Sequence, residues 1–320
     1  MSDVAVLIPT LRRPDSLARA LRSLFAQTGV QGRLREIVVV DNDSLGSAAG
    51  AVQAMAAEAP VPLLYVREPT PGVATARNAG LAAVEAPLIA FLDDDETASP
   101  GWLAALIETL ERFEADVVFG PIQGVLPDET AAHRDYLERF FSRSGPDQSG
   151  PIAEPYGCGG SLMRRASALP GPAPFDPACD ETGGEDDVLF TRLLAGGGRL
   201  AWAAEALAFE HAPSERARLA YALRRAFAYG QSPSQICARA QDWVGVAKWM
   251  AVGAAQAMGW AALAAPAWAL GRPDRAESLD RAVRGLGKLF WAPGFEPRFY
   301  GAAGLACRER TEIGSAQAAN

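Results

Sequence analysis

Short apolar runs alternate with segments of helical spacing along the first 120 residues. Five runs of aliphatic and β-branched residues have the length and composition of strands buried on both faces, at residues 4–9, 36–41, 62–66, 87–93 and 116–120. Between them, residues 13–27 and 100–113 repeat apolar positions every three or four residues and carry a proline near the start, which predicts helices. The alternation predicts an α/β fold with a mostly parallel sheet and helices on both faces.

The ends of the predicted strands are polar and carry charge. In an open sheet of this kind, ligands bind beyond the carboxyl ends of the strands, so these ends are where chemistry is expected. They read "PTLRR" (9–13), "DNDS" (41–44), "EPTPGVATARNAG" (68–80) and "DDDE" (93–96).

Together, these strand ends have the groups that a nucleoside diphosphate and a metal ion need. Asp41 and Asp43 can accept hydrogen bonds from ribose hydroxyls or base N–H groups. Phosphate charge can be neutralised by Arg12, Arg13 and Arg77. The aspartates between them can hold a divalent cation, and hard oxygen ligands with no nearby cysteine favour Mg²⁺ or Mn²⁺ over zinc.

The segment "FLDDDET" (91–97) has three aspartates and a glutamate in a row. In extended backbone, Asp93 and Asp95 fall on one face and Asp94 on the other. Where no cation offsets their repulsion, we expect these carboxylates to have raised pKa values or to face solvent. Taken singly, Asp95 or Ser99 could instead cap the helix predicted over 100–113, but four charged strand ends together favour a shared site.

Five blocks of the chain resemble, in order, those of the family-two glycosyltransferases of the GT-A fold. They are "LIPTLRR", "VVVDNDS", "PGVATARNAG", "IAFLDDDE" and "TGGEDDVLFTRLLAGGGRLAW", and the resemblance covers roughly residues 4–230. It implies a GT-A catalytic domain that transfers a sugar with inversion from a nucleotide-sugar, usually a UDP-sugar, and binds Mn²⁺ or Mg²⁺ through a DxD-type motif.

The resemblance also implies roles for individual residues. Asp93 would approach the ribose and Asp95 would ligate the metal, whereas Asp94 lies in the nucleotide site without an assigned role. His211, which follows the strand-like "LAFEH", would reach the metal or the diphosphate; the alternative is a structural hydrogen-bonding histidine. The remaining residues of the nucleotide pocket would be Pro9, Thr10, Arg12, Asp41 and Asp43, with Arg77 and Asn78 beside them.

Single displacement at an anomeric carbon also requires a base for the acceptor hydroxyl. The block "GGEDDVLF" offers Glu185, Asp186 and Asp187 at the start of a predicted helix. By resemblance to the family's Glu-Asp pair, Asp186 would be the base and Glu185 would bind or position the acceptor. The alternative is that these acidic residues only complement the helix dipole.

Charge is divided unevenly along the chain. The net charge is −8, but residues 1–211 hold 16 basic and 30 acidic side chains, whereas residues 212–320 hold 14 and 8. A basic C-terminal part can face anionic lipid, or it can consist of solvated helix faces. Nucleic-acid binding is disfavoured because the part with the predicted sheet is strongly acidic.

Cysteine usage and the N-terminus bear on location. The four cysteines (Cys158, Cys179, Cys237 and Cys307) include no CxxC pair, so neither a zinc site nor a disulfide framework is indicated. The chain enters a predicted strand within three residues of Met1, which leaves no room for a signal peptide. We therefore expect a cytoplasmic protein.

The segment from Trp249 to Leu270 has no charged residue and is long enough to span a bilayer as a helix. It is rich in alanine and glycine and contains Pro266, which argues against spanning. Its three tryptophans would fall within an arc of about 100°, and arginines follow it. One interpretation is peripheral contact of residues 243–290 with the inner face of the cell membrane. The alternative is a buried helical hairpin.

These observations predict a GT-A catalytic domain at 1–235 and a helical region at 236–320. Within the former, a nucleotide-binding half covers about 1–120 and an acceptor half about 121–235. We expect a hexosyl- or N-acetylhexosaminyl-transferase of cell-surface polysaccharide biosynthesis, acting on a glycan or polyprenyl-linked acceptor. The alternatives are a sugar-nucleotide pyrophosphorylase, which would need a glycine-rich loop where "IPTLRRPDS" stands, and a non-catalytic nucleotide-sugar-binding protein.

Overall fold

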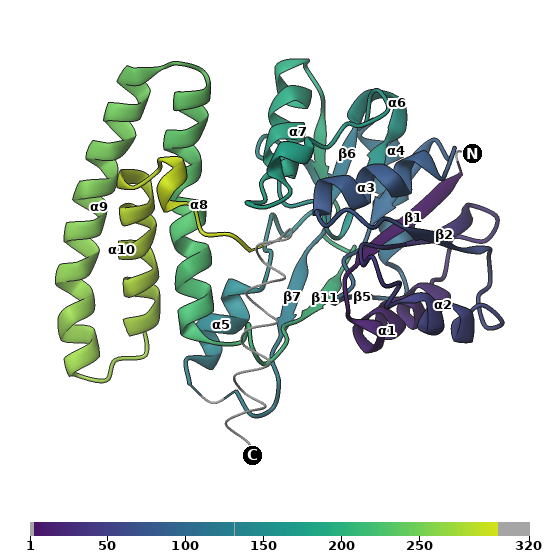
Figure 1. The fold of residues 1–320 in the computed structure, drawn as a ribbon, viewed down its shortest axis with the longest axis horizontal. Coiled ribbons are helices and arrows are strands. Elements are labelled where there is room, and N and C mark those ends of the chain that lie inside the picture. Colours follow the sequence, from purple (N-terminus) through teal and green to yellow (C-terminus); the bar gives the residue numbers. More distant parts are fainter. Residues whose placement is uncertain (1–2, 131, 300–320) are drawn as a thin grey trace. The chain divides into compact units, whose positions relative to one another are not determined.

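The computed structural model describes residues 3–130 and 132–299 (Figure 1). The chain divides into two compact units, the first formed mainly by Met1–Gln123 and Ser142–His211, the second by Gly124–Phe141 and Ala212–Pro297. The chain thus passes from the first unit to the second after His211, and residue 235 lies inside a helix of the second unit, α8 (Leu219–Arg239).

The first unit is built on an eight-stranded sheet. Its strands occur in the order β3-β2-β1-β4-β9-β6-β10-β8. Five of them coincide with the predicted strands: β1 (Val4–Thr10), β2 (Leu34–Asp41), β3 (Leu63–Arg67), β4 (Leu88–Phe91) and β6 (Val117–Phe119). The other three are β8 (Gly150–Ile152), β9 (Ser161–Arg164) and β10 (Leu200–Trp202). Only β9 and β8 run antiparallel to their neighbours, so the predicted mostly parallel α/β sheet is confirmed.

Helices cover both faces of this sheet because alternate strand residues point to opposite sides. Val6 and Ile8 of β1 pack in one core with helices α1 (Pro14–Phe25), α2 (Ala49–Met55) and α4 (Trp102–Arg112). Ala5 and Leu7 pack in the other with α3 (Val73–Ala82), α6 (Arg165–Ala168) and α7 (Glu185–Ala195). Figure 1 shows α1 and α2 on one side of β1 and β2, and α3 and α7 on the other.

The first of the two predicted helices begins as its sequence suggests, and the second has a capping group from elsewhere in the chain. Pro14 occupies the first turn of α1, where its missing N–H costs nothing. At the start of α4, the side chain of Gln27 accepts a hydrogen bond from the Leu103 N–H at 3.0 Å. The capping group considered for this helix therefore comes from the end of α1, and not from Asp95 or Ser99.

A small second sheet stands next to the aspartate cluster. It has the order β5-β11-β7, from β5 (Glu96–Ala98), β11 (Ala208–His211) and β7 (Ile122–Val125). β5 and β11 are antiparallel, with Glu96 opposite Glu210. Because β5 directly follows Asp95, this pairing brings His211 beside the aspartates.

The second unit is helical. It contains α5 (Arg134–Phe140), α8, α9 (Trp243–Ala269) and α10 (Arg275–Leu289), the last three packed side by side (Figure 1). The uncharged segment lies in α9, which stays one helix because Pro266 falls in its last turn. Among the residues described, no helix has both the length and the apolar character needed to cross a bilayer. The short 3₁₀ helices η1 (Pro177–Cys179) and η2 (Pro293–Phe295) complete the described elements.

Candidate active site

The parallel strands bring the predicted residues to one edge of the sheet. Thr10 at the end of β1 is in register with Asp41 at the end of β2. Asp93 follows β4, which pairs with β1 on its other side. The site below therefore sits at the carboxyl ends of β1, β2 and β4, within the first unit.

The aspartates do not lie on alternating faces. The Glu96 N–H donates to the Asp93 carbonyl at 3.0 Å, which closes a turn over Asp94 and Asp95. As a result, both of these neighbours reach Nη1 of Arg13, Asp94 Oδ1 at 2.9 Å and Asp95 Oδ2 at 2.8 Å. The expectation that Asp93 and Asp95 share a face is wrong because it assumed extended backbone through this turn.

Arg13 supplies the positive charge that the cluster needs. Burial lowers the pKa of Arg13, but the carboxylates of Asp94 and Asp95 outweigh it and raise the pKa further above its usual range. Both carboxylates are buried beside this guanidinium, and Asp94 also accepts a hydrogen bond from Thr10 Oγ1 at 2.8 Å. We expected aspartates without a cation either to have raised pKa values or to face solvent. Asp94 and Asp95 do not face solvent, because Arg13 supplies the opposite charge. We expected Arg13 only to neutralise phosphate.

Asp93 lies apart from this pair, next to Arg77 and Glu96. Burial raises the pKa of Asp93, and the charges of Asp95 and Asp94 add to this effect, despite the Arg77 guanidinium 3.5 Å away. Glu96 is buried, and its pKa is raised well above the usual value by burial and by Asp93. A Cβ on Gly159 would lie 2.7 Å from a carboxylate oxygen of each, so a larger residue there would displace these carboxylates. Glu96 belongs to the strand end "DDDE" but had no assigned role, and no motif pointed to Gly159.

Arg77 and Asn78 on α3 contact residues 175–185, which lie about a hundred positions later in the chain. The Arg77 guanidinium is buried, forms an ion pair with Glu185, and stands over the rings of Phe91 and Phe175. Its Nε is buried without a hydrogen-bond partner among the described residues. The Asn78 amide donates to the Phe175 carbonyl at 2.8 Å and accepts from the Phe175 N–H at 3.1 Å. We expected both residues beside the nucleotide. The amide nitrogen and the amide oxygen of Asn78 both form hydrogen bonds with the Phe175 backbone.

The predicted acid-base residues begin α7. Gly184, with φ of 87°, adopts the left-handed conformation that ends the preceding loop and starts the helix. Asp186 Oδ2 accepts a hydrogen bond from the Cys158 N–H at 3.2 Å, and its side chain is half-buried. Burial and the charge of Asp186 raise the pKa of Glu185 to about 7, even though Arg77 opposes the rise. Asp187 is exposed.

Asp41 and Asp43 are strongly engaged at the end of β2. Asp41 is fully buried and its Oδ2 accepts from the Tyr65 hydroxyl at 2.9 Å and from the Ala48 N–H at 2.7 Å. Asp43 accepts from Arg12 Nε at 3.2 Å, and although burial raises the pKa of Asp43, its hydrogen bonds from Leu45 and Arg12 lower it overall. Pro9, one residue before the end of β1, is half-buried.

His211 is held in place by two contacts. Its Nε2 lies 2.9 Å from the Thr97 hydroxyl, and its backbone N–H donates to the Asp95 carbonyl at 2.8 Å. Burial, followed by the positive charge of Arg19, lowers the pKa of His211, which favours the neutral imidazole that a metal requires.

The metal expectation can be tested against these donors. Over residues 3–130 and 132–299, no cluster of three or more histidine, cysteine or acidic side chains could hold a metal by itself. Mg²⁺ is often held by one or two carboxylates together with substrate phosphates. Asp95 is a hard oxygen donor with neutral His211 nearby, so the residues fit a metal that shares its ligands with a diphosphate.

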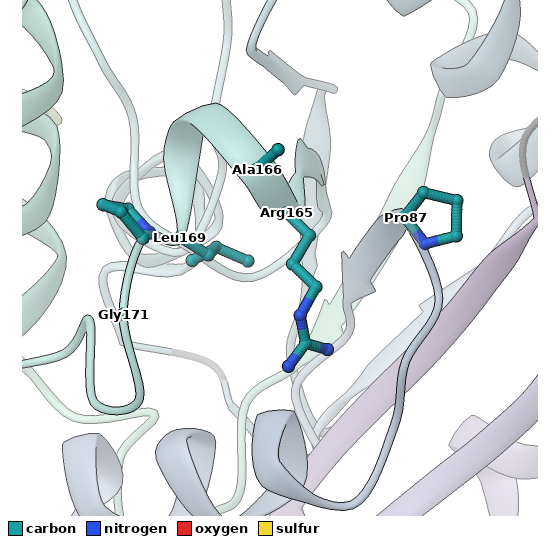
Figure 2. Close-up of a pocket in the computed structure, with 6 residues that line it drawn as sticks. Pro87, Arg165, Ala166, Leu169 and Gly171 are labelled. Carbon is teal, nitrogen blue, oxygen red and sulfur yellow. The ribbon is translucent and has the colours of Figure 1, made fainter.

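One pocket lies away from this site. It has a volume of about 420 Å³ and lies at the start of β4. Figure 2 shows Arg165 among the residues that line it. The Arg165 guanidinium donates to the carbonyls of Val84 and Leu81, so it binds the end of α3 and its following turn. None of the predicted site residues lines this pocket. Its lining residues are Pro87, Arg165, Ala166, Leu169, Pro170 and Gly171.

Comparisons with known proteins place these features in context. The model of the family described as "Glycosyl transferase family 2" matches residues 5–170. The chain is 36% identical over 236 residues to the succinoglycan biosynthesis protein ExoM of Rhizobium meliloti, covering 72% of this chain and 73% of that protein. It is 30% identical over 246 residues to the pre-mycofactocin glycosyltransferase of Mycobacterium tuberculosis, covering 75% of this chain and 48% of that one. The solved structure of TarS from S. aureus superposes on 70% of the chain and 38% of its own length, with 15% identity and a TM-score of 0.49.

Proposed function

This chain belongs to glycosyl transferase family 2, and we propose that its site transfers a sugar, with inversion, from a UDP-sugar to a saccharide. The observation that carries the proposal is the position of Arg77, which forms ion pairs with both Asp93 after β4 and Glu185 at the start of α7. Asp93 belongs to the proposed donor site and Glu185 to the proposed acceptor site. The buried Arg77 guanidinium contacts both, which suits a transfer between two sugars bound side by side.

The donor would bind at the ends of β1 and β2. Asp43 and Pro9 would face the nucleoside, and Asp93 the ribose. The guanidinium of Arg12, which is more exposed than its Asp43 partner, offers charge to a diphosphate. Asp95 and His211 would hold Mn²⁺ or Mg²⁺, which when bound would stabilise the negative charge on the departing diphosphate.

Asp186 would act as the base. The acceptor hydroxyl oxygen forms a bond to the anomeric carbon as the bond from that carbon to the diphosphate oxygen breaks. The hydroxyl proton goes to the Asp186 carboxylate, and the diphosphate leaves with the bonding electrons. Glu185, with a pKa raised to about 7, would orient the acceptor. Asp187 lies exposed one residue further along α7 and has no step in this scheme.

The transferred group would be a hexose or an N-acetylhexosamine, and the pathway cell-surface polysaccharide synthesis. The support is the likeness to ExoM, whose name states succinoglycan biosynthesis. We also propose a glycan or polyprenyl-linked acceptor and a location at the inner face of the cell membrane. Family membership argues against the pyrophosphorylase alternative.

Peripheral membrane contact through residues 243–290 is part of this proposal. Trp243, Met258 and Leu263 of α9 are exposed apolar side chains. Trp260 lies 4.4 Å from the Arg281 guanidinium, and Trp268 lies 5.5 Å from that of Arg275, so cations accompany the aromatic residues. Sedimentation with anionic vesicles checks the contact. Binding that is unaffected by Trp243→Ala and Met258→Ser together would argue against contact through these side chains.

The central test is a screen of UDP-sugars in the presence of Mn²⁺. It measures the rise in melting temperature with each donor and the release of UDP when a saccharide acceptor is added. We expect one donor to stabilise the protein and to be turned over. Asp186→Asn should then reduce kcat by a factor of about 10² or more, while the matched variant Asp187→Asn keeps most of the activity. Failure of every nucleotide-sugar to stabilise or react would overturn the proposal, and equal losses in the two variants would reassign the base.

A further inference from the structure

Helix α3 is attached at three points to residues 175–185, which comprise the segment before α7 and the first residue of that helix. Two have been described: the Asn78 amide pairs with the Phe175 backbone, and Arg77 pairs with Glu185. The third is Asp180, whose Oδ1 accepts hydrogen bonds from the N–H groups of Ala74 at 2.8 Å and Thr75 at 3.1 Å. Its Oδ2 accepts a further bond from the Thr75 hydroxyl at 2.5 Å.

Asp180 thus caps a helix that lies about a hundred positions earlier in the chain. The first N–H groups of a helix have no partner within it and carry partial positive charge, so a carboxylate there is held by both hydrogen bonds and charge. Helix α3 has no cap from its own N-cap residue, Gly72. The remote carboxylate takes that place.

The approach is close enough to require glycine. A Cβ on Gly72 would lie 2.0 Å from the Asp180 carboxyl carbon. The Gly72 N–H in turn donates to the Asn42 side chain at 2.7 Å, and the Asn42 amide donates to the Thr70 carbonyl at 2.7 Å. Asn42 stands between Asp41 and Asp43 at the end of β2, so a continuous set of contacts runs from the proposed nucleoside site to Asp180.

Downstream of Asp180, the described contacts before α7 include a turn hydrogen bond from the Gly183 N–H to the Cys179 carbonyl at 2.8 Å and an exposed ion pair between Glu181 and Arg298 at 3.4 Å. Gly183 and Gly184 both have positive φ angles, 81° and 87°, and lead directly into Glu185 and Asp186. A glycine pair does not by itself fix the direction of the following helix. The Asp180 contacts and the Arg77–Glu185 ion pair do so from the two sides of this turn.

We propose that Asp180 is a positioning residue for the transfer reaction: it fixes the loop before α7 to the N-terminus of α3 and so sets where Asp186 meets the acceptor hydroxyl. The proposal rests on the proposed function for its effect on rate. Asp180 itself contacts neither donor nor acceptor in this scheme. Displacement of a catalytic group by about 1 Å can lower a rate about 10²-fold, so the effect belongs to kcat.

Asp176 provides a matched control. It lies in the same segment, accepts a hydrogen bond from the Ala178 N–H at 3.0 Å and lies 3.5 Å from Arg192, but those contacts are local or on α7 and do not reach α3. Asp180→Asn is the conservative variant, because its carbonyl oxygen can still accept from Ala74 and Thr75.

The test measures kcat and the donor KM for wild type, Asp180→Ala, Asp180→Asn and Asp176→Ala, with hydrogen exchange of residues 171–186 alongside. We expect Asp180→Ala to lower kcat at least tenfold with the donor KM within twofold of wild type, Asp180→Asn to recover most of kcat, and Asp176→Ala to stay near wild type. Exchange over the start of α7 should accelerate only in Asp180→Ala.

Unchanged kcat, equal loss in Asp176→Ala, or unchanged exchange would overturn the inference. If wild type transfers no sugar, the proposed function fails, and the exchange measurement still decides whether Asp180 holds the loop.

Discussion

Arg77 and Glu185 are 108 positions apart in the chain and form a buried ion pair. The same guanidinium lies 3.5 Å from Asp93, so one cation serves two carboxylates from different elements. Removing charges from water is costly, and a buried pair is stable only when each group keeps its partners. The start of α7 is thereby tied to the end of β4 through α3.

Arg77→Met should destabilise the protein strongly. The change leaves Glu185 and Asp93 without their cation, and breaking one side of a buried pair typically costs about 3–5 kcal/mol. Urea unfolding at pH 7 measures the loss. Arg199→Met is the control, because Arg199 and Glu114 form an exposed pair, for which the expected loss is below about 1 kcal/mol. Similar losses in the two variants would contradict the role given to Arg77.

Glu185 should make stability depend on pH. Its folded-state pKa of about 7 lies above the ordinary value of 4.5, so the folded protein holds a proton that the unfolded chain has released between these values. Its contribution therefore becomes less favourable as pH rises from 4.5 to 7. Glu185→Gln keeps a neutral side chain, so its Tm relative to wild type should increase from pH 5 to pH 8. A constant difference would show that the pKa is not raised.

Arg13 should compete with a divalent cation for the aspartates. The Arg13 guanidinium contacts both Asp94 and Asp95. Arg13→Gln therefore removes a positive charge next to Asp95, the proposed metal ligand. The variant should bind Mn²⁺ about tenfold more tightly at low salt. Electron paramagnetic resonance of free Mn²⁺ measures the affinity without substrate. Arg12→Gln, which affects Asp43 instead, should change it little. Weaker binding in Arg13→Gln would mean that Arg13 orders the site for the metal.

Gly159→Ala should be poorly tolerated. The new methyl group would stand 2.7 Å from carboxylate oxygens of Asp93 and Glu96, and overpacking of this kind costs about 1–3 kcal/mol. Gly150→Ala in β8 has nothing within 4 Å and is the control. Urea unfolding of both variants distinguishes a local clash at Gly159 from the general effect of adding a methyl group to a glycine.

The sheet was predictable because its strands are nearly continuous apolar runs. Residues 4–8 and 37–41 are buried on both faces, and such runs with helical segments between them allow few arrangements. The family resemblance, drawn from five ordered blocks, is confirmed, and with it the GT-A fold. Strands β8 and β9 gave no comparable signal, because β8 begins with glycine and proline and β9 has only two apolar residues between polar ends.

Side-chain pairing within the site was harder to predict. The sequence shows that Arg13 and the aspartates end neighbouring strands, but a turn at Asp94 and Asp95 decides that both meet Arg13. Asn78 and Asp180 take their roles from contacts with Phe175 and α3, about a hundred residues away. Such partners depend on tertiary packing, which local spacing does not contain.

The placement of β9 between β4 and β6 bears on the order in which the protein folds as it is synthesised. Strands β1 to β4 come from the first 91 residues and pair with one another, whereas β6 pairs only with β9 and β10, which emerge later. Because N-terminal segments leave the ribosome first, we expect the nucleoside side of the site to be in place while β6 still has no neighbour. The acceptor side, with Glu185 and Asp186, then completes the site as the last part of the sheet closes.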